Sequence, residues 1–257
     1  MEVWGQNKII SMDRKLYETY QKIEEDHWWF VARRKLIYQL ISEFNKKKED
    51  LKILDIGCNS GFLVNKLQEK NYEAYGCDTD EMAVGYGKGR GIKNLKVSSF
   101  PALDYPDNSF DVITCLDVLE HVEDDNQALK EINRIIKKDS VIIMTVPAFQ
   151  FLWGLQDEAS HHFRRYSKKE LTNKIKNNTD WQVIKKSYFN FLLFFPILFI
   201  RKISNILKLK RSSDFDINNN FINKILLIIF SIEIWLLKII SYPFGVSLLV
   251  VAKKKQA

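Results

Sequence analysis

From residue 51 onward the chain alternates short apolar runs with segments of helical periodicity, and this alternation limits the fold more than any other feature. The apolar runs lie at 52–57, 73–78, 95–99, 110–117 and 140–147. The helical segments lie at 62–70, 80–89 and 124–138. Strands that alternate with helices of ~10–15 residues form βαβ units around a parallel sheet. We therefore predict an α/β fold.

Two later runs, 181–189 and 247–254, are typical of further strands and extend the predicted sheet. A helix is expected just before them, over 167–178. Ser167 at its N-cap and Glu170 three residues later have the spacing of a capping box, in which each side chain bonds the backbone of the other residue.

Two apolar segments, 189–200 and 221–240, separate these last strands. Pro196 and Arg201 interrupt the first segment, and charged residues interrupt the second: Lys224, Glu233 and Lys238. We therefore expect neither to span a membrane. In the second segment Glu233 falls in the middle of the apolar helix face, where it either reaches an edge or points into a pocket to contact an acceptor. Basic residues near the junction would suit an anionic membrane interface: Arg201, Lys202, Lys208, Lys210 and Arg211.

This organisation predicts three parts. Residues 1–48 form an N-terminal helical cap, with two helices expected within 13–45. Residues 49–189 together with 245–257 form the α/β domain, and residues 190–244 form an apolar helical insert. The insert is a lid, a homodimer interface or a membrane-facing pair of helices, and the sequence leaves these three open.

Composition narrows the function classes. The chain has 39 Lys and Arg against 32 Asp and Glu, and its lysines are scattered rather than gathered in a stripe, so we expect no nucleic-acid partner. Cys58, Cys77 and Cys115 lie far apart, without a CxxC motif or histidines at metal-ligand spacing, which predicts neither disulfides nor a metal site. No secretory signal is recognisable at the N-terminus, so a cytoplasmic protein is expected.

The sharpest motif is LDIGCNSG at 54–61, which ends the first strand and precedes a helix. Gly57 and Gly61 permit a tight turn and the close approach of a ligand to the backbone, and the helix that follows presents free N–H groups. Asp78 ends the second strand, where a carboxylate accepts hydrogen bonds from both hydroxyls of a ribose. A nucleoside-containing ligand is therefore predicted.

The same loop does not fit a dinucleotide. The GxGxxG fingerprint would require glycines at 57, 59 and 62, and the chain has Asn59 and Phe62 instead. Asp55 also places a negative charge where a pyrophosphate prefers a neutral approach. The pattern favours a cationic nucleoside over NAD.

These blocks resemble those of the class I S-adenosylmethionine-dependent methyltransferases. Four segments carry the resemblance: LDIGCNSG (54–61), YGCDTD (75–80), LDYPDNSFDVITCLDVLEHVEDD (103–125) and EINRIIKKDSVIIMTVP (131–147). Three more resemble a bacterial subfamily: HWWFVARR (27–34), HFRRYS (162–167) and PFGVSLL (243–249). The resemblance implies a Rossmann-like three-layer sandwich. Its seven-stranded sheet would be mostly parallel, with an antiparallel last strand, N-terminal helices and a helical insert before that strand.

The resemblance also implies S-adenosylmethionine as cofactor and assigns its contacts. The methionine portion would be held by Asp55, Gly57, Cys58 and Gly61, with Asn59 at a left-handed position of the turn. The ribose and adenine would contact Asp78, Thr79, Met82, Ser99 and Phe100. The amino group, the sulfonium and the carboxylate would face Leu116, Asp117 and either Arg33 or Arg34. Ser99 departs from the acidic residue that is usual at its position.

Two histidines, His121 and His162, follow the fourth and fifth strands and are our candidates for a general base, because both lie at the ligand-binding edge of the sheet. Either one could instead serve only its own loop, by capping a helix or by hydrogen bonding. Tyr166 is a third catalytic candidate in the same loop as His162.

Arg164 and Arg165 would suit an acceptor that bears a phosphate or a carboxylate, unless they form salt bridges with Glu120, Asp157 or Glu158. Trp28 and Trp29 could wall the acceptor site or simply anchor the N-terminal helix.

We therefore expect an S-adenosylmethionine-dependent methyltransferase that acts on an oxygen of a small, glycan or lipid-linked acceptor. One alternative is a soluble quinone precursor, an amine or an RNA base as acceptor. A second is a non-catalytic cofactor-binding scaffold in glycan or lipid assembly. The expected location is the cytoplasm, where the protein is either free or bound peripherally to the inner face of the membrane.

Overall fold

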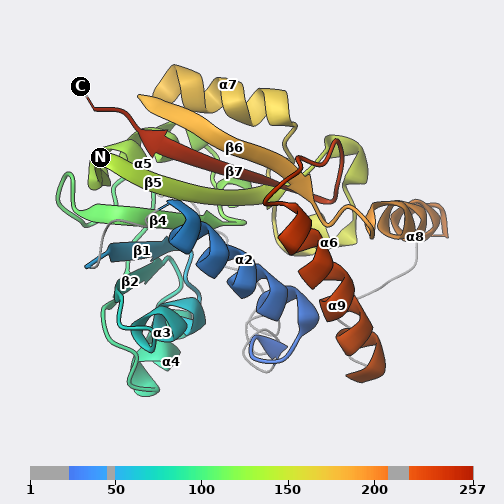
Figure 1. Ribbon diagram of the computed structural model, residues 1–257, viewed down its shortest axis with the longest axis horizontal. Helices are drawn as coiled ribbons and strands as arrows, with labels where there is room; N and C mark the ends of the chain where they lie inside the picture. Colours follow the sequence, from blue (N-terminus) through green and yellow to red (C-terminus); the bar gives the residue numbers. More distant parts are fainter. Residues whose placement is uncertain (1–22, 45–49, 208–219, 257) are drawn as a thin grey trace, which may run out of the picture.

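A seven-stranded sheet with the order β3-β2-β1-β4-β5-β7-β6 forms the centre of the computed structural model, which describes residues 23–44, 50–207 and 220–256 (Figure 1). The strands are β1 (Lys52–Ile56), β2 (Glu73–Asp78), β3 (Leu95–Val97), β4 (Phe110–Leu116), β5 (Ile136–Pro147), β6 (Trp181–Phe189) and β7 (Ser247–Lys254). Strands β1 to β5 pair in parallel, and β7 runs antiparallel between β5 and β6. The predicted mostly parallel sheet with an antiparallel last strand is confirmed.

Helices cover both faces of this sheet and complete three layers. They are α2 (Trp28–Phe44), α3 (Phe62–Gln68), α4 (Glu81–Gly89), α5 (Asp125–Ile135), α6 (Leu155–Ala159), α7 (Lys168–Asn178), α8 (Phe194–Leu207) and α9 (Asn220–Leu236). Figure 1 shows α2 and α9 side by side in front of the sheet, with α5 behind it. Every residue of β4 is buried, because a parallel strand between two helical layers has no solvent-facing side.

The order of the strands places the functional edge. The chain proceeds from β1 to β2 and β3 on one side, and then returns to add β4 and β5 on the other side of β1. In open α/β sheets ligands bind at such a reversal, in the crevice outside the carboxyl ends of the strands. Ile56, Asp78 and Leu116 end β1, β2 and β4, and all three ends therefore meet at this edge.

The boundary between α5 and β5 differs from the expected one. The sequence predicts a helix that continues to residue 138, but the helix ends at Ile135 and β5 begins at Ile136. Ile136 pairs with Phe110 of β4, and Asp139 adopts a left-handed conformation with φ 61° that a helix excludes. The apolar spacing of Ile136 fits both a helix and a buried strand, and the tertiary pairing decides between them.

The N-terminal cap is described only in part. Helix α2 is the second of the two predicted helices, whereas the first falls largely within residues 1–22, outside the described ranges. Helix α2 docks onto α9: Trp28 N–H donates to Asn223 Oδ1 at 2.7 Å, and Asn223 Nδ2 donates to the backbone oxygen of Asp26 at 2.8 Å. Lys208, Lys210 and Arg211 of the predicted basic junction also lie outside the described residues.

The described part of the insert between β6 and β7 contains the helices α8 and α9. One face of α9 is buried through Phe230 and Ile234, and Leu237 directly after the helix is buried as well. Of the helices in the described ranges, none has the length and apolar character needed to cross a bilayer.

The predicted capping box at the start of α7 is present, since Ser167 Oγ accepts the N–H of Glu170 at 3.2 Å and Glu170 Oε2 accepts the N–H of Ser167 at 2.8 Å. We expect Ser167→Ala to lower the free energy of unfolding by about 1 kcal/mol, because one orphan N–H loses its acceptor. Urea denaturation measures the change. Lys169→Ala, on the exposed side of the same helix, is the control and should stay within about 0.5 kcal/mol of the wild type. Equal stability of S167A and K169A would contradict the capping role.

Candidate active site

A cavity of about 1150 Å³ opens at the carboxyl edge of the sheet. One end is lined by the loop after β1 and by the ends of β2 and β4. The other end is lined by the loop that carries His162, by α8 and by the start of α9. The cavity therefore joins the predicted cofactor loop to the apolar insert.

The loop after β1 turns through three left-handed residues, Gly57 at φ 74°, Asn59 at φ 51° and Gly61 at φ 77°. A Cβ atom on Gly57 would lie 2.4 Å from Cγ2 of Val118, so the turn requires glycine for space as well as for conformation. Asn59 is the residue type that best tolerates the middle position, as the sequence predicts. The turn brings the backbone of residues 57–59 to the cavity wall.

Asp78 fixes this loop from the neighbouring strand. Its Oδ2 accepts the N–H of Asn59 at 2.8 Å, and its Oδ1 accepts the N–H of Asp80 at 3.0 Å. Burial raises the pKa of Asp78 above its ordinary value, and these backbone donors oppose that rise. The carboxylate lies at the cavity wall with lone pairs left for the hydroxyls of a ribose.

Two more carboxylates and one guanidinium surround the middle of the cavity. Asp55 is 4% exposed and accepts a hydrogen bond from Thr114 Oγ1 at 2.6 Å. Arg33 Nη1 of α2 lies 2.7 Å from Asp117 Oδ2, which bridges the N-terminal cap to the end of β4. Opposite charges in this order suit a ligand that carries both a cation and a carboxylate.

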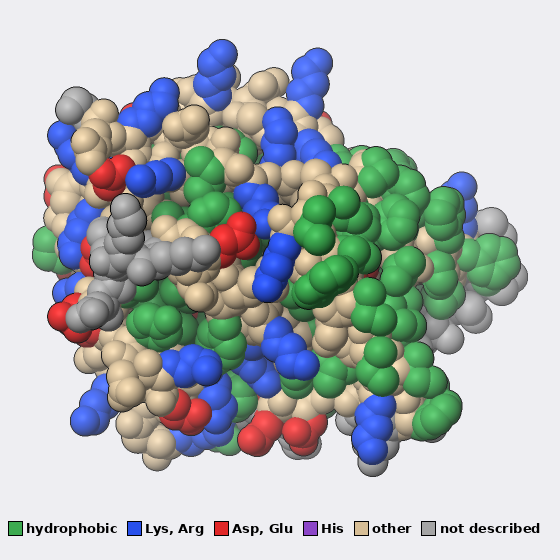
Figure 2. Space-filling model, in the orientation of Figure 1, with side chains coloured by type: hydrophobic (Ala, Val, Ile, Leu, Met, Phe, Trp, Pro, Cys, Tyr) green, Lys and Arg blue, Asp and Glu red, His purple; other side chains and the backbone are tan. Residues whose placement is uncertain are grey.

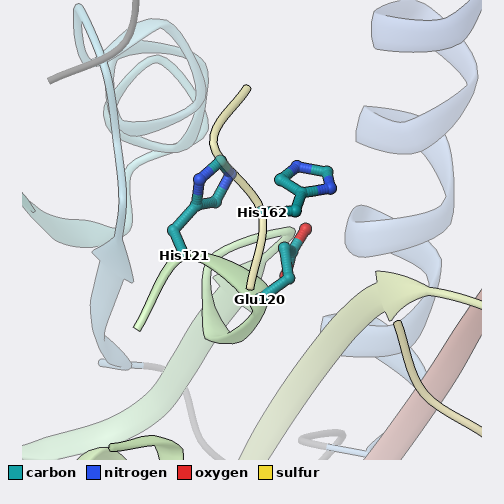
Figure 3. Close-up of side chains that lie close together, drawn as sticks. All are labelled: Glu120, His121 and His162. Atoms are coloured by element: carbon teal, nitrogen blue, oxygen red, sulfur yellow. The ribbon is translucent and has the colours of Figure 1, made fainter. Parts of the chain in front are cut away.

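His121 and His162 face each other further along the cavity, with ring centroids 4.5 Å apart and ring planes at 86° (Figure 3). Burial and the neighbouring His162 lower the pKa of His121 to about 3, so its imidazole is neutral at pH 7 and is a weak base. His162 Nδ1 lies 2.8 Å from Asp157 Oδ1. A carboxylate only accepts, so Nδ1 carries the proton and the Nε2 lone pair stays available.

Asp157 organises this end of the site from a fully buried position. Arg165 Nε and Nη2 donate to its two oxygens at 2.7 and 2.9 Å, and Gly154 N–H donates to Oδ2 at 2.9 Å. These donors hold the pKa of Asp157 at about 2, against the effect of its burial. Arg165 is thus bound in a salt bridge, one of the two alternatives that the sequence left open, while it still lines the cavity.

Trp28 and Trp29 lie at the cavity wall and also anchor α2. Trp29 stacks on Phe189 at 5.9 Å between centroids, and Trp28 meets Phe230 edge to face at 5.6 Å. Both predicted roles, wall and anchor, are therefore compatible with their positions.

Comparison with known proteins identifies the central region. Residues 54–144 match the family described as a methyltransferase domain. This region of the chain is similar to a methyltransferase domain.

Two relatives are named ubiquinone biosynthesis O-methyltransferase. That of Rickettsia canadensis is 28% identical over 155 residues, which cover 53% of this chain and 64% of the relative. That of Rickettsia conorii is 33% identical over 114 residues, which cover 41% of this chain and 39% of the relative. The match thus spans less than two thirds of the length of each relative.

The solved structures show the same fold. Phosphoethanolamine N-methyltransferase 2 of Haemonchus contortus, in complex with S-adenosyl-L-methionine, superimposes with a TM-score of 0.55 at 15% identity and covers 85% of this chain and 52% of its own. The predicted Rossmann-like arrangement of the methyltransferase domain agrees with this likeness.

Most of the predicted site residues of the α/β domain and its N-terminal cap line this same cavity. They are Trp28, Trp29, Arg33, Arg34, Asp55, Gly57, Cys58, Asn59, Asp78, Thr79, Ser99, Phe100, Leu116, Asp117, His121, His162 and Arg165. Arg34 donates to the backbone oxygens of Glu24 and Glu25, so Arg33 is the better placed of the two arginines for a cofactor carboxylate.

Tyr166 and Arg164 do not reach the cavity, which corrects the prediction for both. The hydroxyl of Tyr166 donates to Asp125 Oδ2 at 2.8 Å inside the core, and Arg164 Nη1 pairs with the same carboxylate at 3.0 Å. These contacts occupy the phenol and the guanidinium on the far side of their loop.

Three other predictions are corrected by position. Glu233 is buried and its two oxygens accept the N–H of Phe191 at 3.0 and 3.1 Å, so it anchors the chain after β6 instead of an acceptor. Met82 is 54% exposed on α4, away from the cavity wall. Gly61 shapes the loop but does not itself line the cavity.

Sequence reasoning missed Glu24 and Glu120 as site residues. Glu24 accepts from Ser60 Oγ at 3.2 Å and from Arg90 Nη1 at 3.3 Å, and so ties the cap to the cofactor loop. Glu120 is fully buried and lines the cavity beside His121. The sequence did offer one indication of Glu120, because it directly precedes His121 just after the fourth predicted strand, at the edge where ligands bind.

Burial raises the pKa of Asp55 from 3.8 to about 6. A raised carboxyl pKa means that the folded state holds its proton more tightly than the unfolded state. The stability linked to this proton is therefore present below about pH 4 and is lost as the pH rises through 6. At pH 7.5 the folded ligand-free chain carries a costly buried charge.

We expect Asp55→Asn to raise the unfolding free energy of the ligand-free chain by about 3 kcal/mol at pH 7.5, and by about 1 kcal/mol at pH 4.5. Urea denaturation at both pH values measures this, with the exposed Asp50→Asn as control. A D55N chain that is less stable than the wild type at pH 7.5 would rule out a destabilising buried charge on Asp55.

Proposed function

We propose that this protein transfers the methyl group of S-adenosylmethionine to an oxygen of an acceptor that has a polar head and an apolar tail. The cavity carries this proposal, because one continuous space runs from the cofactor loop to the insert. On the insert side its wall is mostly apolar, with Asn190 and Arg201 as polar members. The apolar residues are Leu193, Pro196, Ile197, Ile200, Ile222 and Leu226.

The cofactor loop fits S-adenosylmethionine on two observations. Asp78 is held at the cavity wall with acceptor capacity to spare, and the left-handed turn at Gly57, packed against Val118, brings the loop backbone to that wall. Asp55 and Asp117 place negative charge near a cationic ligand, and Arg33 can share a carboxylate with Asp117. When bound, the cofactor supplies an electrophilic methyl that passes to the acceptor oxygen, with S-adenosylhomocysteine as the other product.

In this proposal the protein aligns the reactants and removes one proton. The methyl carbon and the acceptor oxygen need to lie ~3–3.5 Å apart and in line with the leaving sulfur. His162 Nε2 accepts the proton of the acceptor hydroxyl, and Asp157 stabilises the imidazolium through Nδ1. Two walls exclude water from the reaction, α2 on one side and the insert on the other.

Two observations favour an acceptor with an apolar tail. The relatives bear the name ubiquinone biosynthesis O-methyltransferase, which supports a quinone precursor as one member of this class. In addition, α8, α9 and the segment after α9 expose large apolar side chains on the surface, where hydrophobic residues gather in Figure 2. The most exposed are Phe195, Phe199, Phe221, Ile228, Ile232, Trp235 and Ile239.

We further propose that this exposed face rests in a membrane interface, from which the insert receives the acceptor. Monomeric soluble proteins rarely expose so many neighbouring apolar side chains. Lys202 on α8, Lys224 near the start of α9 and Lys238 just after its end are exposed and supply positive charge for anionic lipids. The homodimer and lid alternatives are outcomes of the vesicle experiment below.

The first test measures cofactor binding by titration calorimetry. Asp78→Ala should weaken the affinity for S-adenosylmethionine at least about 30-fold, because it removes one or more charge-assisted hydrogen bonds to the ribose. Glu81 is exposed at the start of α4, and Glu81→Gln should leave the affinity for S-adenosylmethionine unchanged. Equal binding by D78A and E81Q, or tighter binding of NAD than of S-adenosylmethionine, would exclude the assigned ribose site.

The second test follows the acceptor. The full chain is incubated with methyl-labelled S-adenosylmethionine and anionic vesicles made from a bacterial lipid extract. We expect the label in the organic phase and the protein among the floating vesicles. Label confined to the aqueous phase would contradict an acceptor with an apolar tail, and binding without any turnover would favour a non-catalytic scaffold.

The insert is tested in the same assay with the double variant Phe195→Glu, Phe199→Glu. These side chains are 63% and 66% exposed, so the substitutions should leave the fold and cofactor binding intact while flotation falls several-fold. Ile184→Glu makes a similar exposed change on β6 and serves as the control. A double variant that floats like the wild type would contradict membrane binding by this face and favour a lid. A wild type that is a dimer and a double variant that is a monomer would favour a homodimer interface.

A further inference from the structure

Glu120, His121 and His162 form a cluster at the acceptor end of the cavity (Figure 3). Glu120 and His121 belong to the 3₁₀ helix Leu119–His121 that follows β4, and His162 lies on the loop after α6. One potential ligand atom from each residue lies within 4.8 Å of the other two. The N–H of Phe163 donates to the backbone oxygen of Glu120 at 2.7 Å and holds the two segments together.

The carboxylate of Glu120 has an unusual environment. The residue is 0% exposed, and neither oxygen has a hydrogen-bond partner. Asp117 and Asp157 add to the negative charge around Glu120, and Arg165, which opposes them, is already paired with Asp157. Burying an unpaired carboxylate costs several kcal/mol, so such a group requires a bound cation or a proton.

Both histidines are already oriented for a ligand. His162 Nδ1 is held by Asp157, which Arg165 and the N–H of Gly154 fix in turn. His121 hydrogen-bonds to the backbone of Ser160. Each ring therefore has one nitrogen engaged and the other left for the cluster. A carboxylate or carbonyl behind each imidazole is the usual support of metal-ligating histidines.

We propose that Glu120, His121 and His162 bind a divalent transition-metal ion such as Zn²⁺. Two imidazoles and one carboxylate are ligands that Zn²⁺ prefers, whereas Mg²⁺ and Ca²⁺ prefer oxygen ligands alone. In a tetrahedral site with bonds of ~2.1 Å the ligand atoms lie about 3.4 Å apart, so small side-chain rotations close the cluster.

Such a site would retain an open coordination position toward the cavity, because all three ligands line its wall. A metal ion at an open position lowers the pKa of a bound hydroxyl oxygen. The site would thus hold the oxygen end of the acceptor beside the cofactor. With the ion bound, His162 Nε2 is a ligand, so the ion would replace His162 in assisting deprotonation of the acceptor and the proton would pass to water. This role rests on the proposed function, whereas ion binding itself does not.

Sequence spacing alone does not indicate this site. His121 and His162 are separated by α5, β5 and α6, and only the contact between the 3₁₀ helix and the later loop brings them together. The proposal therefore departs from the expectation that the chain has no metal site.

The experiment uses the full chain after treatment with a chelator. Zn²⁺ is titrated by calorimetry, and Co²⁺ is titrated while its visible d–d absorption is recorded. We expect one equivalent of each ion to bind, with an absorption typical of nitrogen and oxygen ligands. Zn²⁺ should also raise the melting temperature of the wild type.

Glu120→Gln keeps the shape of the side chain and removes its charge, so it should weaken Zn²⁺ binding at least 100-fold and abolish the rise in melting temperature. His162→Gln should do the same and provides a second variant if E120Q does not fold. His161→Asn is the matched control, since His161 is the exposed neighbour with φ 54°, a conformation that asparagine tolerates.

Three results would overturn the site: no binding by the wild type, equal binding by the wild type and both ligand variants, or equal loss in H161N. Titration with S-adenosylmethionine in metal-free buffer separates this test from the proposed function. Zn²⁺ binding without cofactor binding would leave the metal site in place and remove the proposed methyl transfer.

Discussion

The parallel pairing of β1 with both β2 and β4 is the constraint on which the rest of the site depends. It places the carboxyl ends of three strands side by side, and the loops that leave them compete for the same space. Gly57 resolves this competition, because the side chain of Val118 occupies the volume that a Cβ would need. The cofactor loop and the loop after β4 are therefore shaped together, and a change in either is felt by the other.

A second level of organisation rests on Asp157. This one buried carboxylate caps the start of α6, pairs with Arg165 and orients His162. It converts a loop between β5 and α7 into a rigid wall of the cavity. Because Arg201 of α8 also lies 3.8 Å from Asp157, the same group connects that wall to the insert.

Much of the fold and the cofactor half could be predicted because their signals are local. Alternating runs identified the strands, Asn59 and the two glycines identified the turn, and Ser167 with Glu170 identified a helix start. Asp78 was recognisable because it ends the strand that follows the glycine-containing loop, and in a βαβ unit that position lies beside the loop. Each of these signals is read within a few residues or within one βαβ unit.

The remainder depended on contacts between distant residues. Tyr166 and Arg164 looked available, but both meet Asp125, about 40 residues earlier in the chain. Glu233 was correctly placed on an apolar helix face, yet helical periodicity could not reveal the backbone of Phe191 as its partner. The burial of Glu120 and the lack of hydrogen-bond partners for its carboxylate depend on the loop that carries His162, which lies about 40 residues later in the chain. No spacing rule within one segment reports such pairs.

The docking of α2 on α9 has a consequence for the order in which the protein folds during synthesis. Trp28 and Asn223 lie 195 positions apart, so the acceptor wall cannot close until nearly the whole chain has left the ribosome. The cofactor half, built from contacts within a shorter span, can order earlier. The proposed acceptor site is thus assembled from segments near the two ends of the chain, and variation that changes its specificity would need to alter both segments together.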